Sequence, residues 1–318
     1  MISFLQGDVF DKLKELDDNS IDCVVTSPPY WGLRDYGVLG QLGLEPTYQE
    51  HIQNIVKLFR VMKPKLKDSA TVWLNYGDSY AATINGTKAK DVLNDDRAFR
   101  DKPFSTIQGS IKPKDLVMIP NRIAIALQDD GWWIRSEIIW HKPNPMPEST
   151  KDRPTSAHEK IWLITKSKKY YYDADAIREP VAQGTITRLS EKNLKNQKGS
   201  TRGNGGMKPN GNMKAVGNME TKNKRNVWTI TTKPCKEAHF ATFPKDLIEP
   251  CIKAGCPEGG VVLDPFGGSG TTGIVAKSLN RTAILIELNP SYIEIAKKRI
   301  DKELGMFKWN ILKNLTKS

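Results

Sequence analysis

The stretch Thr26-Ser27-Pro28-Pro29-Tyr30 carries residue types that can hold a planar, amino-bearing group. It follows an apolar run over residues 21–25, so it lies where a buried strand ends. Its two prolines lack N–H groups and fix φ, which leaves carbonyl acceptors without competing donors. Ser27 adds a hydroxyl acceptor, and Tyr30 adds a flat ring for stacking. The pattern fits a planar substrate whose amino group is held by oxygen atoms; the plainer alternative is a strand-ending turn with a packed tyrosine.

A second chemically suggestive stretch, residues 261–273, reads as a strand, a glycine-rich turn and the start of a helix. Glycine lets the backbone approach a ligand closely, and a helix N-terminus supplies unpaired N–H groups. Residues 268–273 also match G-x-G-x-x-G. Glu287 follows Gly268 by 19 residues, where a carboxylate can accept hydrogen bonds from ribose hydroxyls. NAD and S-adenosylmethionine suit this arrangement equally.

The glycine turn comes late in the chain. Only 45 residues follow Gly273, which is room for one more strand and its helix. A complete nucleotide-binding sheet must therefore take its other strands from the N-terminal part of the chain. We expect a cofactor site that is split between the two ends of the chain.

Apolar runs alternate with helical patterns along most of the chain, which argues for a doubly wound α/β fold. Short, nearly continuous apolar runs are typical of parallel strands that are covered on both faces. Strands are expected at residues 2–5, 21–25, 71–74, 131–140, 160–165, 260–263 and 282–286. Helices are expected at residues 9–16, 47–62, 116–127, 244–254 and 290–304, and from the glycine turn to residue 279.

Composition narrows the class of protein. The 318 residues carry 48 Lys and Arg against 36 Asp and Glu, a formal net charge of +12 that favours nucleic acid over a membrane as the partner. Hydrophobic residues make up 38%, as in ordinary globular proteins. No run approaches roughly 18 apolar residues, so we expect no membrane span. The first ten residues carry Asp8 and no basic segment, so we expect no secretory signal. Four irregularly spaced cysteines indicate a reducing cytoplasm.

Taken together, these residues resemble the permuted β class of S-adenosylmethionine-dependent DNA amino-methyltransferases. In that family the proline turn comes early, the target-recognition region lies in the middle, and the Phe-x-Gly-x-Gly cofactor turn comes late. Residues 26–30 match the catalytic motif and residues 264–270 match the cofactor motif. Further segments that look like the family are residues 138–148, 153–172 and 239–244.

The resemblance implies a doubly wound, mostly parallel, seven-stranded Rossmann-like methyltransferase sheet that is circularly permuted and carries an inserted target-recognition region. Residues 1–180 would form the catalytic part of this fold, with a variable loop at residues 81–112. Residues 181–225 would form the basic target-recognition insertion, and residues 226–318 the cofactor-binding part.

The resemblance also implies roles for the matching residues. Ser27, Pro28, Pro29 and Tyr30 would surround the target base. Asp8 would contact the adenine amino group of the cofactor, Phe243 its methionine end and Glu287 its ribose. The remaining residues implied at the cofactor are Asp264, Phe266, Gly268, Gly270 and Thr271.

The implied reaction is site-specific transfer of a methyl group from S-adenosylmethionine to the exocyclic amino group of a base flipped out of double-stranded DNA. In the family, Ser at the position of Ser27 goes mainly with cytosine N4 and Asp mainly with adenine N6. Cytosine N4 is therefore favoured, and adenine N6 is the alternative. Cytosine C5 is excluded, because that chemistry needs a cysteine nucleophile where Pro29 and Tyr30 stand. We expect a cytoplasmic enzyme that is encoded by a bacterium, an archaeon or a phage. Its possible protein partners are a cognate restriction endonuclease that acts on the same site and a second copy of the chain in a homodimer.

The basic segment at residues 181–225 is the candidate DNA contact. It holds ten Lys and Arg against two Glu, and seven Gly with seven Asn predict a loop without helical or strand periodicity. Its basic side chains would contact phosphates, whereas sequence readout requires side chains in the major groove. The candidate DNA-binding residues are Arg188, Lys198, Arg202, Asn204 and Lys208. The alternative is a solvated basic loop, with recognition elsewhere, for example in residues 81–112.

Two functions of other classes stay open at this point. An NAD-dependent oxidoreductase could use the turn at residues 268–273, but it would leave the proline turn and the basic segment unexplained. The other is a non-catalytic nucleic-acid-binding protein that kept the fold. Such a protein would be expected to have lost one of the site residues, whereas residues 27–30 and Glu287 are all intact. The candidate ligands of a zinc site would be Cys235, His239, Cys251 and Cys256. A zinc site is not expected, because these residues lack the usual C-x2-C spacing.

Overall fold

The computed structural model describes residues 1–83, 104–190, 220–232, 243–305 and 310–311. The chain forms two compact units. One unit consists of Met1–Tyr172 together with Asn226–Ser318, and the other is the intervening Asp173–Arg225. The main sheet lies entirely within the first unit.

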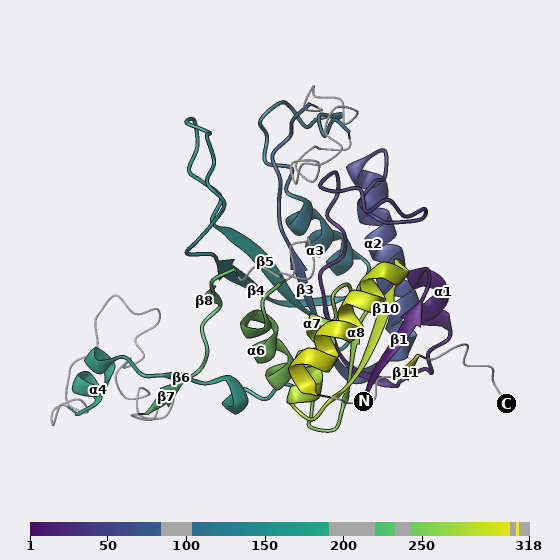
Figure 1. Ribbon diagram of the computed structural model, residues 1–318. Coiled ribbons are helices and arrows are strands. Elements are labelled where there is room, and N and C mark those ends of the chain that lie inside the picture. Colours follow the sequence, from purple (N-terminus) through teal and green to yellow (C-terminus); the bar gives the residue numbers. More distant parts are fainter. Residues whose placement is uncertain (84–103, 191–219, 233–242, 306–309, 312–318) are drawn as a thin grey trace. The chain divides into compact units, whose positions relative to one another are not determined.

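In the described residues, the first unit is built on a nine-stranded sheet with the order β11-β1-β10-β9-β2-β3-β5-β4-β8. Figure 1 labels most of these strands. The bounds are β1 Ile2–Gln6, β2 Ile21–Thr26, β3 Leu66–Tyr76, β4 Trp133–His141, β5 His158–Thr165, β8 Val227–Thr229, β9 Val261–Asp264, β10 Thr282–Glu287 and β11 Asn310–Ile311. The seven strands expected from the apolar runs are the seven central strands. The expected count falls short by β8 and β11, edge strands of three and two residues that are too short to show a period.

The sheet is mostly parallel, as the sequence predicts. Among its described strands, only β5 runs antiparallel to its neighbours, β3 and β4. The late strand β9 pairs with the early strand β2, so that Val24 lies opposite Leu263. The two ends of the chain therefore meet in the middle of one sheet.

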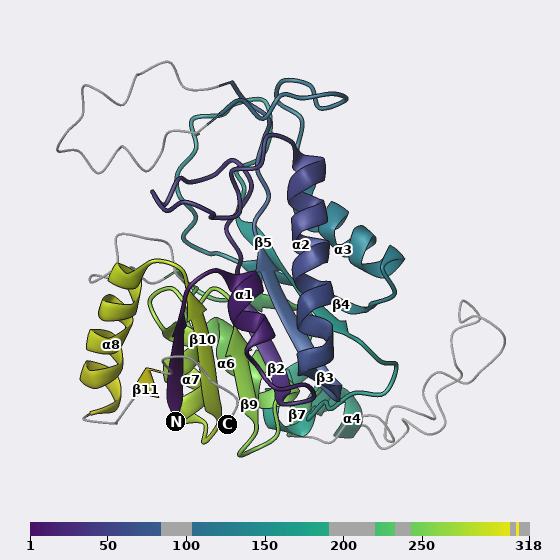
Figure 2. The ribbon, with the colours of Figure 1, turned by 90° about the vertical axis from the view of Figure 1, so that its right-hand side faces the viewer.

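Helices cover both faces of this sheet, which confirms the doubly wound α/β class (Figure 2). On one face α2 packs against both α1 and α3, and on the other α7 packs against both α6 and α8. The bounds are α1 Val9–Lys14, α2 Tyr48–Met62, α3 Ile119–Asp129, α6 Lys245–Gly255, α7 Thr271–Ser278 and α8 Pro290–Leu304. A 3-10 turn, η1 (Lys63–Lys65), follows α2 at the proline that ends it. No helix in the described ranges is long and apolar enough to cross a membrane.

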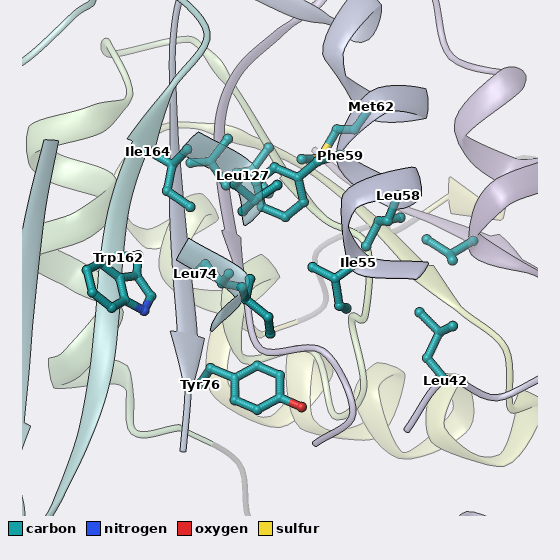
Figure 3. Close-up of a cluster of buried hydrophobic side chains, with 14 of the residues drawn as sticks. Leu42, Ile55, Leu58, Phe59, Met62, Leu74, Tyr76, Leu127, Trp162 and Ile164 are labelled. Carbon is teal, nitrogen blue, oxygen red and sulfur yellow. The ribbon is translucent and has the colours of Figure 1, made fainter. Parts of the chain in front are cut away.

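The core under α2 follows from helical spacing. Ile55, Leu58, Phe59 and Met62 recur at i, i+3, i+4 and i+7, so they form one apolar stripe. Figure 3 shows this stripe beside Leu74 and Ile164 of the sheet and Leu127 of α3. Each of these side chains is almost completely buried. Removal of their apolar surface from water holds the helix layer on β3 and β5.

The second unit contains short elements. They are the 3-10 helix η4 (Asp175–Ile177), the antiparallel pair β6 (Glu179–Pro180) and β7 (Thr221–Lys222), and the helix α4 (Gln183–Ser190). Arg178 joins the two strands by donating to the hydroxyl and the carbonyl of Thr221 at 2.8 and 3.0 Å. The expectation of a segment without helical periodicity was wrong for α4. The glycines and asparagines that suggested a loop lie almost all after Ser190. For this reason the composition of the whole segment did not indicate the eight-residue helix that ends at Ser190.

Phe59 gives a test of the core. It is 1% exposed and packs edge-on against Trp132, with 5.2 Å between ring centroids. We expect Phe59→Ala to lower the free energy of unfolding by about 3–5 kcal/mol, measured by urea denaturation, because it leaves a cavity. Ile125→Ala on α3 is the control: this side chain is 59% exposed, and its loss should change stability by no more than about 0.5 kcal/mol. Equal effects of the two substitutions would contradict the assignment of the core.

Candidate active site

The diproline turn (residues 27–30) and the glycine turn (residues 265–270) begin at the carboxyl ends of the adjacent strands β2 and β9. The Thr26 hydroxyl donates to Asp264 Oδ1 at 2.8 Å, although 238 residues separate the two. Thr272, in the first turn of α7, donates to Asp264 Oδ2 at 2.6 Å. The strand order reverses at β2 and β9, and ligands of open α/β sheets bind outside such a switch point.

A cavity of about 620 Å³ opens at this place, within the size range of small-molecule sites. Eleven of the twelve residues expected at the target base and the cofactor line it: Asp8, Ser27, Pro28, Pro29, Tyr30, Phe243, Asp264, Phe266, Gly268, Thr271 and Glu287. Gly270 is the twelfth, and it instead lies at the start of α7 against α8. A Cβ built on Gly270 would be 3.0 Å from Ala296 Cβ, so its glycine serves helix packing.

The glycine turn is shaped by positive φ angles and by close packing. Gly268 has φ +49°, and Gly270, which precedes α7, has φ +79°. Both values lie in the left-handed region that favours glycine. At Gly267 a Cβ would come within 2.8 Å of the Leu285 side chain. The backbone of the turn therefore lies directly on β10, next to the cavity.

Glu287 ends β10 and holds the glycine turn from the side. Its two carboxylate oxygens accept from the backbone N–H groups of Gly268 and Asn289, each at 2.8 Å. Burial raises the pKa of Glu287 despite these hydrogen bonds. The side chain is therefore oriented before any ligand arrives, with its carboxylate in the wall of the cavity.

Asp264 is a buried carboxyl group in the same wall. Burial raises its pKa to about 6, although Thr272, Thr26 and the backbone N–H of Phe266 all donate to it. At neutral pH it is mostly ionised, with little water around it. A desolvated negative charge of this kind favours a cationic ligand group.

Asp8 has a structural task besides lining the cavity. It is the N-cap of α1, and its Oδ1 accepts from the N–H groups of Phe10 and Asp11 at 2.8 and 3.3 Å. Phe243 lies just before α6 and is half-buried at the cavity. These two side chains, from opposite ends of the chain, contribute to the same cavity.

A buried arginine that the sequence reasoning missed supports the glycine turn. Arg299 of α8 donates to the carbonyl and the hydroxyl oxygen of Ser269, both at 2.6 Å, and to Thr271 Oγ1 at 3.2 Å. Its charge is matched by Glu303 at 3.6 Å. The local sequence does not distinguish Arg299, since a single arginine in an amphipathic helix normally faces water.

On the other side of the cavity, the Tyr30 ring stacks on Tyr76, with 4.4 Å between centroids and 26° between planes. The Tyr30 hydroxyl donates to Glu159 Oε2 at 2.9 Å, and the Ser27 hydroxyl lies 3.3 Å from the Tyr30 oxygen. Burial, and then the charge of Glu159, raise the pKa of Tyr30 well above its ordinary value. Tyr30 therefore stays a neutral hydroxyl group throughout the physiological range.

Tyr76 connects this turn to a buried polar network. Its oxygen accepts from the backbone N–H of Trp31 at 2.7 Å and lies 2.8 Å from His51 Nε2. His51 is fully buried, and its Nδ1 lies 2.8 Å from Glu45 Oε2. Because an ionised carboxylate only accepts, His51 donates from Nδ1 to Glu45. Burial alone would raise the pKa of Glu45, but the contact with His51 outweighs it and lowers that pKa.

A second group that the sequence reasoning missed surrounds Glu159, the second residue of β5. Asn75 Nδ2, near the end of β3, donates to Glu159 Oε2 at 3.0 Å, and Lys142 forms an ion pair with Oε1. The Lys142 ammonium also lies 4.3 Å from the Trp140 ring centroid. All four side chains line the cavity. The antiparallel direction of β5 brings its first residues to the edge where β2 and β3 end, and this pairing could not be read from local sequence.

Most of the candidate DNA-binding residues lie outside the part of the chain that the structure describes. Arg188 lies in α4, and Lys198, Arg202, Asn204 and Lys208 lie outside the described residues. Of the candidate zinc ligands, Cys251 and Cys256 are buried cysteines, whereas Cys235 and His239 lie outside the described ranges. Where the structure describes the chain, it contains no group of three potential metal ligands.

Comparisons with known proteins bear on this site. The sequence model of a family described as DNA methylase matches residues 21–298. The Type II methyltransferase M.Cfr9I of Citrobacter freundii is 44% identical over 301 residues, which is 95% of this chain and 88% of that protein. The Type II methyltransferase M.SmaI of Serratia marcescens is 45% identical over 294 residues, 92% of this chain and 89% of that protein.

Solved structures share the fold. The PvuII DNA methyltransferase, described as cytosine-N4-specific, superimposes with a TM-score of 0.62 at 18% identity, covering 99% of this chain and 96% of that one. A putative DNA modification methylase of Thermus thermophilus, solved with S-adenosyl-L-methionine, gives 0.60 at 21% identity, covering 98% and 100%. At these identities the likeness concerns the fold alone.

Tyr76 gives a test of the network behind the diproline turn. We expect Tyr76→Phe to lower the free energy of unfolding by about 1–3 kcal/mol, because the buried N–H of Trp31 loses its acceptor. Thermal or urea unfolding measures this loss. Tyr172→Phe is the matched control, because this tyrosine is 43% exposed. A loss no larger than that of the control would contradict the network's role.

Proposed function

This chain belongs to the DNA methylase family, and from that premise we propose that its cavity brings S-adenosylmethionine to a base of double-stranded DNA and methylates the exocyclic amino group of that base, with cytosine N4 as the target. The observation that carries the proposal is a single cavity lined by both turns, the glycine turn after β9 and the diproline turn after β2. One turn suits a nucleoside-bearing methyl donor, and the other suits a planar base with an amino group.

The residues on the glycine side fit S-adenosylmethionine. Glu287 can accept hydrogen bonds from the ribose hydroxyls, as expected for a carboxylate that ends the second strand of such a unit. Asp264 offers an ionised carboxylate to the positively charged end of the ligand. Phe266 and Phe243 add apolar surface to the same cavity. When bound, the ligand supplies a methyl group on a positively charged sulfur, which is an electrophile.

The residues on the diproline side fit the amino group of a base. The lone pair of that nitrogen is delocalised into the ring and is a poor nucleophile. Oxygen acceptors at Ser27 and at the carbonyl of Pro28 hold its two protons and favour a tetrahedral nitrogen with an exposed lone pair. Positioning and exclusion of water then provide most of the rate enhancement. Tyr30, fixed on Tyr76, offers a ring on which the extruded base stacks, which partly offsets the few kcal/mol that flipping costs.

Cytosine N4 is the proposed target because Ser occupies position 27. A hydroxyl in this place accompanies cytosine N4 in the resembling family, whereas a carboxylate accompanies adenine N6. The PvuII enzyme, which shares the fold, is described as cytosine-N4-specific. Adenine N6 is the alternative outcome, since adenine also presents an amino group beside a ring nitrogen.

The DNA-binding part of the proposal rests on charge. The segment 181–225 holds a formal charge of +8, and it would neutralise phosphates and make binding fall steeply with salt. Relatives named as Type II methyltransferases suggest a role beside a restriction endonuclease that cuts the same site. That endonuclease and a second copy of this chain are the protein partners that we propose.

The reaction can be tested directly. The purified protein is incubated with methyl-labelled S-adenosylmethionine and duplex DNA, and the DNA is digested to nucleosides for mass spectrometry. We expect N4-methylcytosine as the labelled nucleoside. Ser27→Ala is the matched variant, with a single-turnover rate lower by about 100-fold or more and unchanged affinity for the methyl donor. Labelled N6-methyladenine would correct the base, and no labelled nucleoside would contradict the function.

The affinity for S-adenosylmethionine should fall as the pH is lowered through about 6. Burial raises the pKa of Asp264 to about 6, so its carboxylate is ionised above that pH and takes up a proton below it. Because protonation removes its attraction for the cationic ligand, we expect the dissociation constant to rise roughly tenfold per pH unit once the pH is well below 6. Isothermal titration calorimetry measures this dependence.

Two variants separate the groups involved. Asp264→Asn should bind more weakly at neutral pH and depend much less on pH than the unchanged protein. Glu287→Gln should bind more weakly but keep the pH dependence, because Asp264 is intact. An affinity of the unchanged protein that is constant across this pH range would contradict the role of Asp264.

A further inference from the structure

Three polar side chains form a continuous line from the diproline turn to β5. Ser27 Oγ lies 3.3 Å from the Tyr30 hydroxyl oxygen, and that oxygen lies 2.9 Å from Glu159 Oε2. All three residues line the cavity. The line therefore starts at the hydroxyl group proposed to hold the target amino group and ends on a carboxylate.

The direction of these hydrogen bonds follows from chemistry. A carboxylate in an ion pair has no proton to give, so the Tyr30 hydroxyl donates to Glu159. The Tyr30 oxygen then accepts the proton of Ser27. Both hydroxyl protons point toward Glu159, and the lone pairs of Ser27 Oγ are left to accept a hydrogen bond from a substrate.

Glu159 is held in a geometry that can receive a proton. Asn75 donates to Oε2 at 3.0 Å, the oxygen that also accepts from Tyr30, and Lys142 forms an ion pair with Oε1. The side chain of Glu159 is 18% exposed, so water can reach it. It can therefore accept a proton from Tyr30 and later release it to solvent.

The proposed reaction produces a proton that must leave the nitrogen. An N–C bond forms to the methyl carbon as the C–S bond breaks, and the electron pair of that bond stays on sulfur, which becomes neutral. As this bond forms, positive charge builds up on the nitrogen and its proton becomes more acidic. A hydrogen-bonded acceptor connected to a base can take that proton while the bond forms, which lowers the barrier to methyl transfer.

We propose that Glu159 is the terminal acceptor of this proton, which it receives through Tyr30 and Ser27. The nitrogen gives its proton to Ser27 Oγ, the Ser27 proton moves to Tyr30, and the Tyr30 proton moves to Glu159 Oε2. The products are a neutral methylated amino group, two hydroxyl groups and a protonated Glu159 that then loses its proton to water. This inference rests on the proposed function and assigns to it a proton path that the local sequence did not indicate.

The test compares Tyr30→Phe, Glu159→Gln and the double variant. Tyr30→Phe keeps the ring that stacks on Tyr76 but removes the hydroxyl, and Glu159→Gln keeps an acceptor oxygen but removes its basicity. With saturating DNA and methyl donor, we expect each single variant to lower the single-turnover rate by about 100-fold or more. The double variant should be no slower than the slower single variant, because both changes break the same path. The unchanged protein should react more slowly in heavy water, and the variants should lose that isotope effect.

Readouts other than turnover separate a proton path from a structural role. Affinity for S-adenosylmethionine is measured by calorimetry, and base flipping by the fluorescence of 2-aminopurine at the target position. We expect both to stay within a few-fold of the unchanged protein. Loss of binding or flipping sufficient to explain the slower rate would overturn the proposal. A normal rate in Glu159→Gln would also overturn it, as would losses that multiply in the double variant. If the unchanged protein methylates no DNA, the proposed function itself has failed.

Discussion

The hydrogen bond from Thr26 to Asp264 joins the two ends of the chain where the site lies. It connects β2 to β9 at 2.8 Å, and the parallel pairing of these strands places the diproline and glycine turns side by side. The bond also ties a buried, mostly ionised carboxylate to the sheet, with Thr272 as its second hydroxyl donor. Without this junction, the half of the fold that suits a nucleoside and the half that suits a planar amino group would not share a cavity.

The residues around the cavity are fixed before any ligand binds. Tyr30 is stacked on Tyr76, which is hydrogen-bonded to the buried His51 and, through it, to Glu45. On the other side, Glu287 holds the backbone of the glycine turn, and α8 supports that turn through Arg299. Buried polar groups that are fully paired in this way specify one geometry, because any other arrangement leaves a polar group without a partner. Such preorganisation is what a reaction that depends on positioning requires.

Much of this could be predicted from the sequence. Apolar runs indicated the seven central strands. The two turns, together with Asp8, Phe243 and Glu287, indicated eleven residues that line one cavity. These features are local, since each depends on a few neighbouring residues with a distinctive type or period. The match to the DNA methylase family agrees with the resemblance that the same motifs carry.

The rest depends on contacts between distant parts of the chain. Glu159 reaches the site only because β5 runs antiparallel to β3, and Arg299 only because α8 packs behind the glycine turn. Neither residue carries a local signal that separates it from an ordinary surface charge. Gly270 has such a signal, but its conformation serves the start of α7 and its packing on α8. The helix α4 was hidden because composition was averaged over a long segment.

The most direct test of the shared cavity is a crystal structure of the protein with S-adenosylhomocysteine and a duplex that contains its target site. It should show the ribose on Glu287, the target base against Tyr30, and the sulfur facing the amino group that Ser27 holds. A nucleoside bound away from Glu287, or a sulfur that faces away from the diproline turn, would contradict the claim that the two turns serve one reaction.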